Sequence, residues 1–182
     1  MKPIANDIES EFQYAKDFYN SESSLIESVL LKINILLPYE NNALEFYHDQ
    51  LYQILFDNRN LLVFGHDLSG YFFLCKKNKE IGYLYKEDSE WRLKYCNKNL
   101  DEFICFNNIF ISMVHRKIEY QDRFDPEKII PALEQYFCDV DEHAMKVEKD
   151  FWPTRLYEFS DGFFPLGDAR VKFYQDLAKA TD

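Results

Sequence analysis

The sequence predicts an α+β domain in which an antiparallel sheet of four or more strands is packed by N-terminal and C-terminal helices. Residues 61–97 provide the first observation. Four short apolar runs, rich in Val, Ile, Tyr, Phe and Trp, are separated there by small turn clusters. The connections are too short for a crossover helix, so neighbouring strands must pair antiparallel. The sequence on both sides has helical spacing, and 182 residues without repeats or linkers predict one domain over residues 1–182.

Two helices are predicted before the sheet. Residues 1–20 are only weakly periodic and suit an arm or a short helix. Apolar residues then recur with a period near 3.6 between Leu25 and Leu37, which predicts a helix that Pro38 ends. A second helix is predicted after Asn41 or Asn42, until a polar cluster at residues 57–60 turns the chain into the first strand. The expected buried face of this second helix is Leu44, Tyr47, Leu51, Ile54 and Leu55.

The four runs of the sheet are residues 61–66, 71–75, 81–85 and 91–96. The first two are apolar without alternation, which suits central strands. The last run alternates, so Trp91, Leu93 and Tyr95 are expected to face the core while Arg92 and Lys94 face water.

Helical patterns return after the sheet. Asn97 or Asn99 is the expected cap of a helix that packs across the sheet. Its apolar face is Leu100, Phe103, Ile104, Ile111, Val114 and Ile118. Pro126 suits the first turn of the next helix, whose stripe is Ile129, Ile130, Leu133, Tyr136 and Phe137. Further helices are predicted over residues 150–159, ending at Asp161 and Gly162, and over residues 169–178.

The net charge of −11 argues against nucleic-acid and anionic-membrane partners, which require clustered Lys and Arg. Residues 119–168 hold thirteen acidic and five basic residues, a balance of −8 out of −11. A docking surface for a basic protein is one interpretation, and a solvated helical face is the other. The candidate contact residues are Asp139, Asp141, Glu142, Glu148, Asp150 and Trp152. Aromatic residues make up 18% of the chain, and Tyr71, Tyr83 and Trp152 are candidate anchors if exposed.

Catalytic patterns are scarce. The sequence contains no GxSxG, GxxxxGK[ST] or GxGxxG motif. Adjacent residues on a strand point to opposite faces, so His66 and Asp67 are not expected to act together, and Asp67 is expected to accept hydrogen bonds from turn amides. Glu45 and His48, three apart on the second predicted helix, leave a small metal-dependent hydrolase as a remote alternative. No cofactor is expected.

Four cysteines without a CxxC pair predict buried, reduced thiols. The N-terminus lacks a signal-peptide pattern, and the longest uncharged apolar stretch, residues 103–114, is too short to span a bilayer. A cytoplasmic protein, monomeric or weakly dimeric, is therefore expected.

Residues 61–110 resemble a known family in the order of their motifs. A strand ending in Phe-Gly leads into a polar turn, an aromatic strand, a hairpin strand with two tyrosines and a helix start of the form LxEF. This order resembles the SUKH superfamily of bacterial immunity proteins, which also includes Smi/Knr-type regulators of fungal cell-wall synthesis. The matching residues, taken as fold determinants, are Phe64, Gly65, Asp67, Gly70, Tyr83, Tyr85, Leu100, Glu102 and Phe103.

The resemblance implies an α+β domain with a mixed or antiparallel sheet. It also implies a non-catalytic immunity protein that binds and neutralises a cognate toxin, such as a nuclease or a nucleic-acid deaminase. The partner would be basic, matching the acidic charge of this chain. A regulatory or scaffold module of the Smi/Knr type is the alternative within the same family. The family supplies no catalytic residues, so none is expected here.

Overall fold

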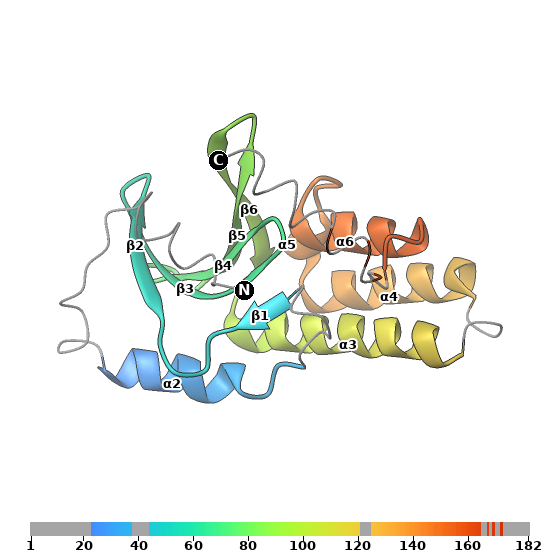
Figure 1. Cartoon of the computed structure of the whole chain (residues 1–182), viewed down its shortest axis with the longest axis horizontal. Helices are drawn as coiled ribbons and strands as arrows, with labels where there is room; N and C mark the ends of the chain where they lie inside the picture. Colours follow the sequence, from blue (N-terminus) through green and yellow to red (C-terminus); the bar gives the residue numbers. More distant parts are fainter. Residues whose placement is uncertain are drawn as a thin grey trace.

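The computed structural model describes residues 23–37, 44–120 and 125–164, together with residues 167, 169 and 172. It contains an antiparallel sheet flanked by helices, which confirms the predicted α+β class (Figure 1). The arm expected over residues 1–20 lies outside the described residues. So does the closing helix expected over residues 169–178, apart from two isolated positions.

Six strands form the sheet, and all of their pairings are antiparallel. They are β1 (Leu44–Phe46), β2 (Tyr52–Phe56), β3 (Arg59–Asp67), β4 (Gly70–Cys75), β5 (Ile81–Glu87) and β6 (Glu90–Asn97). The order is β1-β3-β4-β5-β6, and β2 also pairs with β3. β1 and β2 therefore share one edge of the long strand β3, at its end and its beginning. The four strands predicted over residues 61–97 are confirmed.

The prediction of a helix after Asn41 or Asn42 is wrong, because the chain forms β1 and β2 there. In β2, Tyr52 and Ile54 are buried whereas Leu55 is 45% exposed, which is the period of two of a strand. Asp57 and Asn58 then adopt left-handed φ angles of 48° and 56°. They form the two-residue turn between β2 and β3, a position that favours Asn and Asp.

Five helices lie on one side of the sheet in the described part of the chain. They are α2 (Ser23–Ile33), α3 (Leu100–Glu119), α4 (Pro126–Val140), α5 (Glu142–Met145) and α6 (Phe151–Ser160). Figure 1 shows α2 and α3 along one side of the molecule, with α4 and α6 next to α3. The predicted cap is confirmed at Asn99, whose side chain accepts a hydrogen bond from Glu102 N at 3.0 Å. α2 ends at Ile33, earlier than the position predicted from Pro38.

None of these described helices has the length and apolar character needed to cross a membrane. Several predicted members of the helical stripes also face outward: Ile118 is 43%, Ile129 37% and Tyr136 45% exposed. The apolar stripes of α3 and α4 are therefore narrower than their sequence patterns predict.

The two faces of the sheet belong to two apolar clusters. The larger cluster packs Phe64 and Phe72 of the sheet against Phe103 of α3 and Trp152 of α6. The smaller cluster lies on the opposite face and includes Val63 and Phe73. In β6, Trp91 and Leu93 pack partly against the smaller cluster and Tyr95 against the larger one, so these three residues do not share one face as predicted. Arg92 is exposed and Lys94 is half-buried.

At two glycines of the motif that resembles the SUKH family, neighbouring atoms come so close that no side chain would fit. A Cβ atom at Gly65 would lie 2.5 Å from Phe46 Cδ1 and 2.7 Å from the Glu45 carbonyl oxygen, so β1 could not approach β3 as it does. A Cβ atom at Gly70 would lie 2.3 Å from the Leu84 carbonyl oxygen. Both contacts are shorter than van der Waals packing permits. Of the other matching residues, Phe64, Leu100 and Phe103 are buried, and Tyr85 stacks on Tyr83 with ring centroids 6.1 Å apart.

Candidate protein-binding surface

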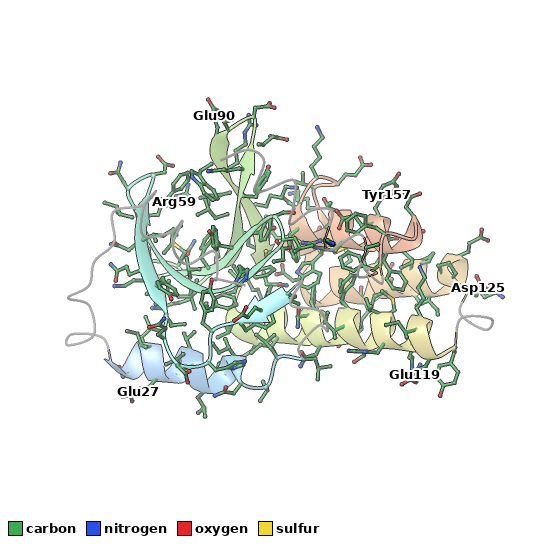
Figure 2. The ribbon with its side chains drawn as sticks, viewed as in Figure 1. Glu27, Arg59, Glu90, Glu119, Asp125 and Tyr157 are labelled. Atoms are coloured by element: carbon green, nitrogen blue, oxygen red, sulfur yellow. The ribbon has the colours of Figure 1, made fainter. Side chains whose placement is uncertain are left out.

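The solvent face of α4 and the segment that follows it carry an unbalanced negative charge. α4 buries Ile130, Leu133 and Phe137 on one side. The exposed acidic residues beyond that side are Glu127, Glu134, Asp139, Glu142 and Glu148, and these five define the acidic helical surface. Figure 2 shows Asp125, at the start of α4, near Glu119 at one end of the helical layer.

Basic side chains offset only part of this charge. Lys128 Nζ is held 2.8 Å from Asp125 Oδ2, outside the five acidic residues. Lys146 and Lys149 are exposed before and after Glu148 and offset two of the five negative charges. The remaining basic residue of the described segment 125–164, Arg155, points inward and is only 17% exposed. The acidic helical surface therefore keeps a net negative field toward solvent.

The exposed apolar side chains of α4 lie on the flank opposite Glu127 and Glu134. Ile129 and Tyr136 of α4 are seven residues apart and share one flank of the helix, whereas Glu127 and Glu134 share another. Tyr136 is 45% exposed, and its hydroxyl lies 3.8 Å from Cys105 Sγ of α3. On α6, Tyr157 is 69% exposed and points away from the core (Figure 2). Asp139 follows Tyr136 by three residues on α4, so this acid neighbours an exposed aromatic side chain.

Asp141, predicted as part of the exposed surface, is instead 4% exposed, so that prediction is wrong. Its Oδ2 accepts hydrogen bonds from the Tyr95 hydroxyl at 3.1 Å and from Lys98 N at 2.9 Å, and its Oδ1 accepts one from Ala144 N at 3.4 Å. Burial, and then the nearby Asp141 carboxylate, raise the pKa of Tyr95. Asp141 therefore joins the end of β6 to the start of α5.

Trp152 is also buried, at 1% exposure, so it cannot be the surface anchor that the sequence suggested. Its Nε1–H donates to Asn97 Oδ1 at 2.8 Å, which satisfies an amide that is itself fully buried. The other two candidate anchors, Tyr71 and Tyr83, are 2% and 5% exposed. The exposed tyrosines of α4 and α6 take their place as accessible aromatic residues.

Asp150 is neither fully buried nor fully exposed. It is half-buried at the start of α6, where its carbonyl accepts hydrogen bonds from Thr154 N at 3.2 Å and Thr154 Oγ1 at 2.7 Å. Burial raises the pKa of the Asp150 carboxyl. Of the six candidate contact residues, the structure therefore places Asp139, Glu142 and Glu148 at the surface.

Asp67 fulfils the predicted turn role. Its Oδ1 accepts hydrogen bonds from Ser69 N at 2.8 Å and Gly70 N at 3.0 Å. The same oxygen accepts the Tyr83 hydroxyl, and Oδ2 forms an ion pair with Arg155 of α6. Burial is the main cause that raises the pKa of Tyr83. The Asp67 carboxylate thus connects the β3–β4 turn to α6, which is distant in the sequence.

The residues of the hydrolase alternative do not share a helix. Glu45 is in β1, and His48 follows this strand with its Nδ1 2.8 Å from Asn34 Oδ1. Within the described residues, no group of three His, Cys, Asp or Glu side chains is arranged to hold a metal. The Nδ1 atom of His66, the residue before Asp67, lies 3.1 Å from the Tyr47 hydroxyl oxygen. Burial lowers the pKa of its imidazole, which favours the neutral ring.

No protein-family model, curated protein or solved structure matches the chain. The likeness to SUKH proteins therefore rests on the order of residues between positions 61 and 110.

Proposed function

We propose that the chain is a non-catalytic immunity protein of the SUKH type, which neutralises a basic toxin domain by binding it at the acidic helical surface. The single observation that supports this most is the concentration of exposed carboxylates on α4 and the segment after it. The resemblance over residues 61–110 supplies the class of partner.

The charge would act mainly on the rate of encounter. Carboxylates on one face raise the local concentration of a cationic protein and orient its approach, an effect that salt screens over about 8–10 Å. Exposed ion pairs add little to final affinity. Association with a basic toxin should therefore be fast at low ionic strength and slow as salt is added.

Affinity would come from exposed apolar side chains of α4 and α6. Interface energy concentrates in a few aromatic and other large residues that become desolvated on binding. Tyr136 and Ile129 on α4, and Tyr157 on α6, are exposed in the free protein. Each offers apolar area that only a partner would cover.

The polar groups of the interior support a binding role over a catalytic one. Asp67 and Asp141 each accept several hydrogen bonds that hold elements together, and the Trp152 indole satisfies Asn97. These hydrogen bonds give each of the three groups a structural role.

Co-purification tests the proposal directly. The protein is expressed with each product of the adjacent reading frames, and capture and relief of growth inhibition are measured. A double variant, Glu134→Lys with Asp139→Lys, should weaken both, whereas the matched control Glu27→Lys with Asp49→Lys, exposed on other parts of the chain, should not. The proposal fails if no neighbouring product is bound or neutralised. Capture of a housekeeping protein would instead favour a Smi/Knr-type regulatory role.

A further inference from the structure

A cavity of about 200 Å³ lies between the sheet and the helices, away from the acidic helical surface. The β3–β4 turn, α3, α6 and residues 163–164 enclose it. Its walls are largely aromatic: Phe72, Phe110, Phe151, Trp152, Phe163 and Phe164. The polar residues at its boundary are Asp67, Ser69, Asn107, Arg155 and Glu158.

The size of the cavity suits one small ring compound. An engineered apolar cavity of about 150 Å³ is known to hold benzene, so a slightly larger cavity can take a substituted ring. Aromatic walls favour a flat guest, because rings pack edge-to-face or offset against one another. A drug-sized molecule would need at least about 300 Å³.

Hydrogen-bond donors remain available at the boundary. Arg155 uses Nη1 on Glu158 at 3.0 Å and Nη2 on Asp67, while its planar group lies over the rings of Phe151 and Phe164. A guanidinium has five N–H groups, so three of them make no hydrogen bond to any described residue.

Asn107 adds a second donor. It is 4% exposed, and the hydrogen bond of its amide to a described residue, Asn108 Oδ1, is long at 3.5 Å. A guest that accepts hydrogen bonds would satisfy this buried amide as well as Arg155.

The charges around the cavity oppose a charged guest. Asp67 and Glu158 already flank Arg155, so an anion would face two carboxylates. A cation would find both carboxylates already paired with the Arg155 guanidinium, which would repel it. Moving a charge out of water without a partner is costly, whereas a neutral acceptor meets unused donors at little cost.

We propose that this cavity is a binding site for a compact, uncharged aromatic compound that carries a hydrogen-bond acceptor, such as an aromatic amide or a nucleobase. The site goes beyond the proposed protein-binding function and does not depend on it. Asn107 and Arg155 would bind the acceptor, and the phenyl rings would hold the flat body.

Four single-ring probes test the chemistry: benzamide, toluene, benzoate and benzylamine. Binding to the full chain is measured by calorimetry and by the shift of the Trp152 indole N–H signal in NMR spectra. Benzamide should bind and move this signal. Benzoate and benzylamine should bind more weakly by about tenfold or more, because each would bury a charge that the cavity does not balance.

Variants separate the polar contact from the apolar walls. Asn107→Leu should weaken benzamide by about tenfold and leave toluene unchanged, because only benzamide has an acceptor. The control Ser112→Leu adds apolar mass at an exposed position of the same helix and should change neither. If Asn107→Leu does not fold, the binding of the four probes to the unmodified protein tests the proposal by itself. Absence of benzamide binding, equal binding of the charged probes, or benzamide binding that Asn107→Leu leaves intact would overturn the proposal.

Discussion

Removing the Asp67 carboxylate should destabilise the protein more than removing the whole Asp67–Arg155 pair. The two side chains are 8% and 17% exposed and form an ion pair between the β3–β4 turn and α6. Asp67→Ala leaves the Arg155 cation in the interior with only Glu158, whose side chain is 28% exposed. It also removes the acceptor of the Tyr83 hydroxyl and of two turn amides.

The expected cost of Asp67→Ala is about 3–5 kcal/mol, the usual penalty for a buried charge that has lost its partner. A domain is stable by only about 5–15 kcal/mol, so this loss is a large share of the total. Adding Arg155→Leu removes the stranded charge and leaves an apolar side chain among Phe151 and Phe164. The double variant should therefore be more stable than additivity predicts, by about 2 kcal/mol or more.

Urea unfolding, followed by tryptophan fluorescence, is measured for the unmodified protein, the two single variants and the double variant. The departure of their unfolding free energies from additivity is the coupling energy of the pair. The exposed pair Lys32–Asp101, 2.7 Å apart and 41% and 69% exposed, is the matched control. Its coupling should stay below about 1 kcal/mol. Additive effects at Asp67 and Arg155, within about 0.5 kcal/mol, would refute the interpretation of this pair as a buried tie between sheet and helix.

Three further predictions concern single residues. Gly65→Ala should destabilise the protein by about 1–3 kcal/mol in urea unfolding, because the new Cβ would meet β1; a cost near zero would show that β1 can move away. Trp152→Phe should cost about 1–3 kcal/mol, since it leaves the buried Asn97 oxygen without its indole donor; an equal cost in the Asn97→Leu background would contradict this. The folded protein holds the pKa of His66 below the ordinary value of 6.5, so the unfolded chain binds a proton first as pH falls. Stability should therefore decrease from about pH 7 to about pH 5, and His66→Gln should reduce this slope; an unchanged slope would exclude His66 as the source.

The four strands of residues 61–97 could be predicted because the information is local. Each is a short apolar run that ends at turn residues, and the short connections leave only antiparallel pairing. The start of α3 could be predicted to within two residues, since Asn97 and Asn99 both precede the apolar stripe, and Asn99 caps the helix. Patterns of this kind depend on neighbours in the sequence.

β1 and β2 could not be recognised from the apolar spacing alone. Residues such as Leu44, Leu51 and Leu55 fit a helical period, but pairing with β3 determines the outcome. The signal that was available is the two-residue Asp57-Asn58 turn between Phe56 and Arg59, which favours a hairpin over a helix end.

The burial of polar residues near the candidate site could not be predicted from the sequence. Asp141 lies in an acidic stretch that looks solvated, yet it bonds to Lys98 N, 43 positions earlier. Arg155 pairs with Asp67 across 88 positions. Hydrophobic periodicity contains no information about such distant partners, and an acidic composition predicts a surface only where no distant donor takes up the carboxylate.

The acidic helical surface is the proposed site at which a basic partner binds. The most direct measurement is the association rate constant with the neighbouring toxin product, taken by stopped flow at several salt concentrations. The unmodified protein should associate fast at low salt and slow steeply as salt increases, whereas Glu134→Lys with Asp139→Lys should associate about tenfold more slowly or worse and lose most of the salt dependence. The Glu27→Lys, Asp49→Lys control should behave like the unmodified protein. Equal rates and equal salt dependence in all three proteins would contradict the proposed surface.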